Sequence, residues 1–142
     1  MEELKKFMLN SKALEEFDKL MGYHLDKVEE LEINEIITNS KLYNIISLCT
    51  NIKQLTITGD LRTDVNKIPN KEEVHALNLT NIDFGKKAFS LCKVFENLRY
   101  FNVDGLKNCI FDDFSFIYDN KKILRFEFFH NTVKFKDVNS LI

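Results

Sequence analysis

The stretch Ile52-Lys-Gln-Leu55-Thr-Ile57 places apolar residues at its first, fourth and sixth positions, and the chain contains this arrangement five times. The copies begin at Val28, Ile52, Val74, Leu98 and Ile123, so the interval from each copy to the next is nearly constant. Self-similarity at a period of roughly 20 to 50 residues is the signature of a repeat architecture, in which each unit packs its apolar side against the next. The sequence therefore predicts one structural unit per copy, stacked along the chain.

The five copies resemble the unit of the leucine-rich repeat family, L-x-x-L-x-L-x-x-N/C-x-L, over roughly residues 28–135. The last copy fits every position, with Asn131 at the Asn position and Val133 at the final one. In the family this Asn bonds backbone groups in the turn that leaves the strand. The other four copies have Ile36, Asp60, Ile82 and Leu106 at this position, so we expect irregular turns there. The resemblance implies an α/β leucine-rich-repeat-like solenoid, a short horseshoe with one parallel strand per repeat and short helices or loops on its convex side.

The connectors between the copies carry further apolar residues. Those at 40–49 and 86–92 have helical spacing and predict two short helices. Ser-Leu-Cys occurs in both, so we expect Cys49 and Cys92 to be buried free thiols rather than redox groups or metal ligands. The connector at 63–71 lacks a helical period and contains the only proline, which predicts an extended loop, either functional or simply an irregular part of its repeat.

Residues 1–27 are expected to form a helical N-terminal cap, ahead of one continuous domain of about five units in residues 28–142. An open end of a stacked-repeat protein exposes apolar surface, and a cap shields that surface. The apolar residues of the first segment fall on one helical face and comprise Leu4, Phe7, Met8, Leu14, Phe17, Leu20 and Met21.

The composition narrows the classes of function. Twenty basic and 22 acidic residues leave a net charge of −2, which supplies no general attraction for nucleic acid or anionic lipid. The sequence shows neither a secretory signal nor an apolar run of membrane-spanning length, so we expect a cytoplasmic protein. Three widely spaced cysteines fit neither a disulfide framework nor a zinc site, and His24, His75 and His130 lie in no catalytic motif. We therefore expect a non-enzymatic protein with no catalytic residue, cofactor or metal, and with no nucleic-acid or membrane partner.

The alternation of a strand assigns the residues of each copy to two faces. The second and third apolar residues should face the core, and positions three, five and seven should face the concave side as three columns. The first column is Glu30, Gln54, Ala76, Tyr100 and Arg125, the second is Glu32, Thr56, Asn78, Asn102 and Glu127, and the third is Asn34, Thr58, Thr80, Asp104 and Phe129.

We expect the concave face to bind an unidentified protein or peptide. Tyr100, Arg125 and Phe129 belong to residue types found among interface anchors, although Phe129 could instead pack beneath the C-terminal segment and Tyr100 could serve only as a strand former. Five strands make a face on the order of 400 Å², below the roughly 800 Å² per partner of a standard interface, which favours a peptide unless loops contribute. The candidate binding residues are Glu30, Glu32, Gln54, Thr56, Asn78, Tyr100, Asn102, Asp104, Arg125, Glu127 and Phe129.

The C-terminal edge of the predicted sheet supports a different hypothesis. Residues 136–142 resemble the opening of another connector and stop before a helix could be completed. An uncovered edge at Phe126 and Phe128 would invite pairing with another chain, so the alternative function is a structural subunit that self-associates, as a homo-oligomer, through this edge. Alternatively, residues 133–142 fold over the edge as an irregular cap.

Overall fold

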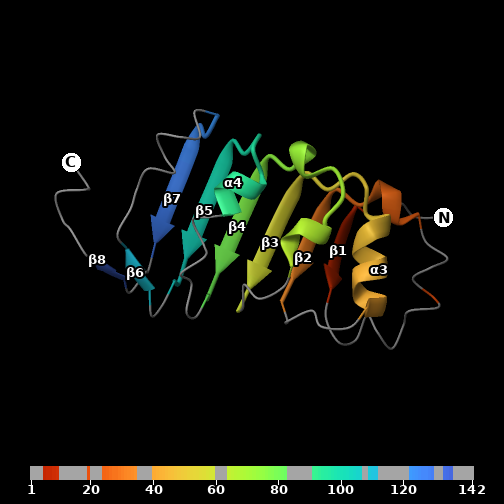
Figure 1. Cartoon of the computed structure of the whole chain (residues 1–142), viewed down its shortest axis with the longest axis horizontal. Helices are drawn as coiled ribbons and strands as arrows, with labels where there is room; N and C mark the ends of the chain where they lie inside the picture. Colours follow the sequence, from red (N-terminus) through yellow and green to blue (C-terminus); the bar gives the residue numbers. More distant parts are fainter. Residues whose placement is uncertain are drawn as a thin grey trace.

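The computed structural model of the chain describes residues 5–9, 19, 24–34, 40–59, 64–82, 91–106, 109–111, 122–129 and 133–135. In this part of the chain, six strands form one sheet in the order β1-β2-β3-β4-β5-β7, and every neighbouring pair is parallel (Figure 1). The strands are β1 (Lys6–Leu9), β2 (Glu30–Ile33), β3 (Gln54–Thr58), β4 (Ala76–Thr80), β5 (Tyr100–Asp104) and β7 (Arg125–Phe129).

The remaining described elements are short. A second, two-stranded parallel sheet joins β6 (Cys109–Phe111) to β8 (Val133–Phe135). Two α-helices, α3 (Ser40–Leu48) and α4 (Leu91–Val94), occur among the connectors. Three 3-10 helices, η1 (Leu25–Lys27), η2 (Val65–Lys67) and η3 (Lys71–Glu73), complete the described elements. The chain therefore has an α/β structure built on one six-stranded parallel sheet, as far as its residues are described.

The register of the sheet follows the sequence repeat residue for residue. Leu31, Leu55, Leu77, Phe101 and Phe126 are successive partners in one row, and each occupies the fourth position of its copy. The sixth-position residues Ile33, Ile57, Leu79 and Val103 form the next core-facing row and are fully buried. The predicted strands and the predicted faces of copies one to four are thus confirmed.

The first strand corrects the expected N-terminal cap. Residues Lys6–Leu9 form β1, which pairs in parallel with β2, so the helix expected there is wrong. A helical face would have buried both Phe7 and Met8, whereas the strand buries Phe7 and Leu9 and leaves Met8 46% exposed. Residues 10–18 and 20–23, which carry the rest of the expected cap, lie outside the described residues.

A sixth copy of the sequence repeat underlies β1. Leu4-Lys-Lys-Phe7-Met-Leu9 has apolar residues at positions one, four and six. Leu4 precedes Val28 by the same interval by which Val28 precedes Ile52. The sheet therefore contains six copies of the pattern and not five.

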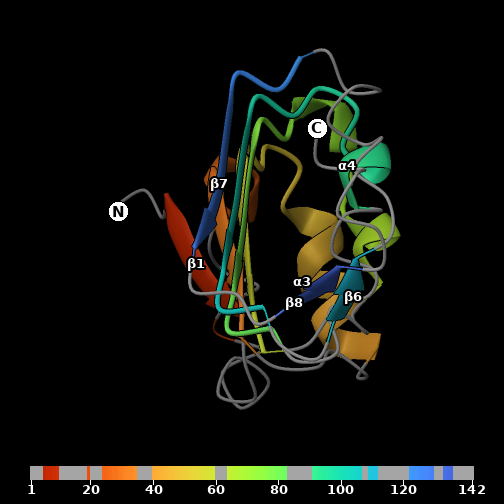
Figure 2. The same ribbon diagram turned by 90° about the vertical axis from the view of Figure 1, so that its left-hand side faces the viewer.

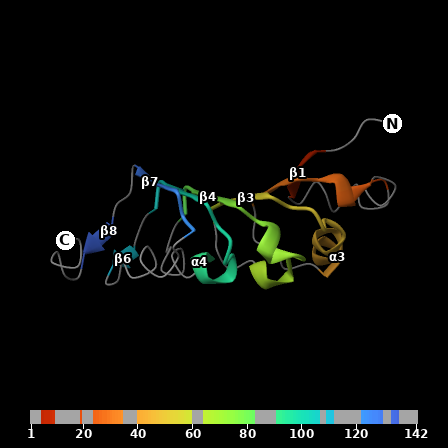
Figure 3. The ribbon, with the colours of Figure 1, turned by 90° about the horizontal axis from the view of Figure 1, so that it is seen from above.

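The helices α3 and α4 and the β6–β8 pair lie on one face of the six-stranded sheet (Figures 2 and 3). The core fills the space between them and the sheet, where α3 contributes Ile45 and Ile46 and the helix is followed by Cys49, all of them buried. Each fully buried aliphatic side chain of this size contributes roughly 1.5–3 kcal/mol to folding. The helix predicted at 40–49 is therefore confirmed, while of the one predicted at 86–92 only the part within α4 is described.

The thiol predictions are confirmed at one of their two positions. Cys49 is free and buried, and its burial raises the pKa of the thiol from 9.0 to about 12, because the thiolate would lose its hydration. Cys92 lies in α4, but its side chain is outside the described residues, as is that of Cys109 in β6.

The connector at 63–71 is not the extended loop that its sequence suggests. It contains η2, and η3 begins at its last residue. The side chain of Asp64 accepts a hydrogen bond from the backbone N–H of Asn66 at 3.1 Å and so caps η2. A helix this short produces no period in the sequence, which explains the error. Val65 and Ile68 are buried, so this connector belongs to the core.

The turns that leave β3, β4 and β5 are alike. Each has a left-handed residue at the eighth position of its copy: Gly59 at φ +91°, Asn81 at φ +50° and Gly105 at φ +81°. The ninth position, where the leucine-rich pattern has Asn, holds Ile82 and Leu106 in the fully buried core. In the described part of these turns a left-handed Gly or Asn therefore recurs at the same position, and this backbone suits those residue types. Of the positions where irregular turns are expected, Ile36 and Asp60 lie outside the described residues.

Candidate binding face

One face of the six-stranded sheet is not covered by any described helix or strand, and we call it the open face (Figure 3). Its described side chains alternate along each strand with the buried ones. The open face consists of the described side chains of Lys6, Met8, Glu30, Glu32, Asn34, Gln54, Thr56, Thr58, Ala76, Asn78, Thr80, Tyr100, Asn102, Asp104, Arg125 and Glu127.

The three predicted columns are brought together as expected. Register partners run from Glu30 to Arg125 in the first column and from Glu32 to Glu127 in the second. In the third column, Phe129 partners Asp104 through its backbone, but the side chain of Phe129 lies outside the described residues. Lys6 and Met8 extend the first two columns by one strand. The predicted columns do not include them, because a helix is predicted where β1 lies.

The middle of the open face is made of small, uncharged side chains that bond to one another. The hydroxyls of Thr58 and Thr80 lie 2.6 Å apart and share a hydrogen bond across β3 and β4. Asn78 donates from Nδ2 to the hydroxyl of Thr56 at 3.4 Å. Ala76 completes this region, which we call the central floor, so a partner can approach the sheet backbone more closely here than over the larger residues on either side.

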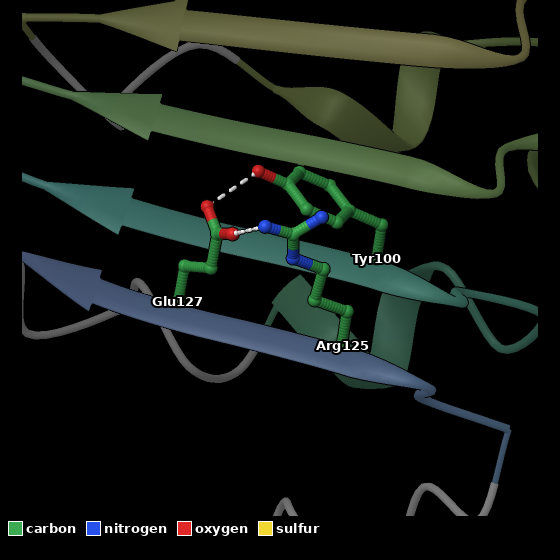
Figure 4. Close-up of polar contacts among 3 residues, drawn as sticks. All are labelled: Tyr100, Arg125 and Glu127. Carbon is green, nitrogen blue, oxygen red and sulfur yellow. Dashed lines mark hydrogen bonds and ion pairs between the residues drawn. The ribbon is translucent and has the colours of Figure 1, made fainter.

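Three larger residues form a cluster over β5 and β7, the Tyr100 cluster (Figure 4). The Tyr100 hydroxyl donates to Glu127 Oε2 at 2.8 Å, and Arg125 makes an ion pair with Glu127 Oε1. The Arg125 guanidinium lies over the Tyr100 ring, 5.8 Å from its centroid, in a cation–π contact. Glu127 is not the register partner of Tyr100, so their hydrogen bond is a diagonal contact between neighbouring strands.

The electrostatics of the Tyr100 cluster follow from these contacts. Burial raises the pKa of the Tyr100 hydroxyl, the hydrogen bond to Glu127 and the negative charge of Glu127 raise it further, and Arg125 opposes them. The Glu127 side chain is 18% exposed, whereas that of Arg125 is 71% exposed. The cluster thus gives the guanidinium two contacts while most of the Arg125 side chain remains accessible to a partner.

Two carboxylates occupy the other side of the central floor. Glu30 and Glu32 are half-buried on β2, and neither makes a hydrogen bond or ion pair with any side chain that the structure describes. Beside them, Asn34 donates from Nδ2 to the sulfur of Met8 at 3.2 Å. Lys6 is exposed at the register position next to Glu30.

The open face has a small negative charge. Its described charged residues are four acids and two bases, which gives −2, and they are Glu30, Glu32, Asp104, Glu127, Lys6 and Arg125.

Two amide oxygens, Oδ1 of Asn34 and Oδ1 of Asn102, are buried without a hydrogen-bond partner among the described residues. An unsatisfied buried acceptor costs roughly 1–3 kcal/mol.

Metal-ligand clusters and long apolar helices are absent from the residues that the structure describes. Within these ranges, no group of three or more His, Cys, Asp or Glu side chains is placed to hold a metal ion. No helix among the described elements has the length and apolarity needed to cross a membrane. Comparisons of the chain with protein-family models, curated proteins and solved structures find no match.

Proposed function

We propose that this chain is a non-enzymatic protein-interaction module that binds a peptide or a short protein segment on the open face. The observation that carries the proposal is the Tyr100 cluster, in which an exposed arginine side chain contacts a carboxylate and an aromatic ring at one side of a polar sheet face. Tyr and Arg are the residue types that most often anchor interfaces, and prior ordering of their side chains reduces the entropy lost on binding.

The architecture that we propose for this module is a short leucine-rich-repeat-like solenoid. Six copies of the pattern at nearly constant intervals, each with one parallel strand in register with the next, support it. The helices α3 and α4 on the opposite face of the sheet are also in keeping with it. The buried apolar residues at the Asn position make the chain a divergent example of such a repeat.

The size of the open face favours a peptide as partner. Six strands at roughly 4.8 Å spacing, each about five residues long at roughly 3.3 Å per residue, give an area on the order of 500 Å². This is well below the roughly 800 Å² that each partner contributes to a standard interface.

A selection experiment tests the proposal. A displayed library of random 12-residue peptides is selected on the purified chain, and the enriched peptides are synthesised and titrated against Asn78→Arg, which puts a long side chain in the middle of the central floor. Asn66→Arg is the matched control, since Asn66 is exposed on η2. We expect Asn78→Arg to weaken binding at least tenfold and Asn66→Arg to leave it unchanged, with both variants keeping the native circular-dichroism spectrum. Equal binding to both variants would remove the open face as the site.

Self-association through β7 is the second candidate function. No described strand pairs with the outer side of β7, and its charged residues Arg125 and Glu127 lean inward over β5 (Figure 4). Charges on an edge strand normally discourage pairing with another chain, and these do not point outward. Of the alternative, a cap formed by residues 133–142, the structure describes only β8, which pairs with β6; residues 136–142 lie outside the described residues.

Light scattering over a concentration series tests this second candidate. Leu124, directly before β7, is 83% exposed, so Leu124→Glu adds a charge at this edge without opening the core. Leu48→Glu is the control, because Leu48 is a partly exposed leucine on α3. Edge pairing predicts a dimer or larger oligomer that Leu124→Glu dissociates and Leu48→Glu does not. A monomer at every concentration would rule out this function.

A further inference from the structure

The charges of the open face are arranged on opposite sides of the central floor. Glu30 and Glu32 lie on β2, where no described side chain neutralises them, and Arg125 lies on β7 with 71% of its side chain exposed. Along the first two columns, the strands that lie between them, β3, β4 and β5, present only uncharged residues. A partner that crosses the strands along these two columns therefore meets negative charge at one end, uncharged side chains in the middle and a guanidinium at the other end.

The guanidinium retains binding capacity despite its ion pair. Arginine has five N–H donors in a planar fork, and the contact with Glu127 Oε1 comes from Nη2. The cation–π contact with the Tyr100 ring places the guanidinium over β5, on the open face of the sheet. A carboxylate from a partner could therefore bind the free side of the fork, in the geometry that arginine prefers.

The distance between the two charged sites sets the length of the partner. Four strand-to-strand steps separate β2 from β7, which at roughly 4.8 Å each is about 19 Å. An extended chain advances about 3.3 Å per residue, so about six residues span this distance.

We infer that the partner is an extended peptide that lies across the strands, with a Lys or Arg side chain over Glu30 and Glu32 and an Asp or Glu side chain on Arg125, about six residues away. Small or polar residues occupy the positions between, where they face the central floor. This inference rests on the proposed function, because it specifies the ligand of the same face. Electrostatic complementarity of this kind fixes the direction and register of the bound peptide more than its total affinity.

Substitutions that reverse or remove charges, made in the chain and in the peptides, test the inference. Peptides enriched in the selection above are titrated against Glu30→Lys/Glu32→Lys, with Glu72→Lys/Glu73→Lys as a control that makes the same change in charge on exposed residues of η3. Arg125→Gln is compared with Lys67→Gln, which removes an exposed positive charge from η2.

The expected result has three parts. The enriched peptides share a basic and an acidic residue about six positions apart, and Glu30→Lys/Glu32→Lys weakens them at least tenfold while Glu72→Lys/Glu73→Lys changes binding less than twofold. Replacing the basic residue of the peptide by Glu then restores binding to Glu30→Lys/Glu32→Lys. Arg125→Gln weakens the same peptides at least fivefold while Lys67→Gln leaves them unchanged, and replacing their acidic residue by the corresponding amide adds no further loss to Arg125→Gln.

Two other outcomes distinguish failure of the inference from failure of the proposed function on which it rests. Peptides that lose binding to Asn78→Arg but show no paired charges, or that tolerate Glu30→Lys/Glu32→Lys, overturn the inference and leave the open face as the binding site. Peptides that bind Asn78→Arg as well as the unchanged chain overturn both.

Discussion

The glycine after β5 provides a sharp test of the structure. At Gly105 the backbone has φ +81°, and a Cβ added there would lie 2.7 Å from Oδ1 of Asn81, 3.2 Å from its backbone N and 3.3 Å from its Cα. The side-chain oxygen of Asn81 can rotate away, but its backbone N–H donates to the carbonyl of Asp104 at 2.8 Å and is held there by the sheet. Gly105→Ala should therefore strain both the turn and its neighbour.

Gly59 is the natural control, because it occupies the same position one turn before Asn81. Its φ is +91°, but a Cβ there would have no heavy atom within 4 Å. A left-handed alanine costs about 1–2 kcal/mol, and the loss of chain entropy in the unfolded state returns about 0.4–1 kcal/mol of it. Gly59→Ala should thus lower the free energy of unfolding by about 1 kcal/mol. Gly105→Ala carries the same strain plus an overpacking term of about 1–3 kcal/mol, for a total of about 2–4 kcal/mol.

Urea unfolding followed by circular dichroism measures both losses on one scale. We expect Gly105→Ala to be less stable than Gly59→Ala by at least about 1 kcal/mol. Asn81→Gly, which suits the left-handed backbone of that residue, should recover part of the difference by removing Oδ1. If the two alanine variants unfold at the same urea concentration with equal slopes, the close packing of successive turns is wrong.

Three further predictions concern single side chains. Tyr100→Phe removes the hydroxyl that donates to Glu127 and should lower the free energy of unfolding by about 1 kcal/mol in urea; an unchanged midpoint would show that this hydrogen bond contributes nothing. Asn102→Thr removes a buried acceptor without a described partner and adds a strand-forming residue, so the free energy of unfolding should rise by about 1 kcal/mol; a loss would contradict this interpretation of Asn102. Cys49 has a thiol pKa raised from 9.0 to about 12, so between these pH values the unfolded chain releases a proton that the folded chain keeps. The contribution of the protonated Cys49 thiol to the free energy of unfolding is fully present below pH 9. Above that pH, the contribution is lost at up to about 1.4 kcal/mol per pH unit. Urea titrations from pH 8 to 11 should show this decline in the unchanged chain and a shallower one in Cys49→Ala, whereas parallel pH profiles would contradict it.

The columns of the open face could be predicted because two periods in the sequence agree. The nearly constant repeat length aligns equivalent positions such as Asn78 and Asn102, and the alternation of the strand then gives each position a face. Neither step depends on which family the repeat resembles, which is why the departures at Ile82 and Leu106 did not disturb the register.

The two wrong predictions concern short segments, and each error has a physical cause. Residues 4–9 fit both the sheet pattern and a helical face when read alone, and only their place one repeat length before Val28 favours the strand. The 3-10 helices η2 and η3 are shorter than one period of any helical pattern. The recurring left-handed position could have been predicted from the recurrence of Gly59, Asn81 and Gly105 at one place in the repeat, because Gly and Asn are the residues that tolerate that backbone.

The Tyr100 cluster shows what the sequence could not supply. Register alone pairs Tyr100 with Arg125, but the hydrogen bond crosses to Glu127 and depends on the rotamers of all three side chains. The repeat register predicts that Tyr100 and Arg125 are neighbours, but only the structure shows that Arg125 contacts Glu127 and Tyr100 and is exposed at the same time.

The most direct test of the open face as the binding surface is a nuclear magnetic resonance titration of the ¹⁵N-labelled chain with the tightest selected peptide. We predict that amide shifts concentrate on β2 to β5 and β7, with the largest changes near Asn78 and Arg125, and that η2, η3 and α3 change little. Shifts confined to those helices, with the open-face strands unchanged, would contradict the assignment of binding to the open face.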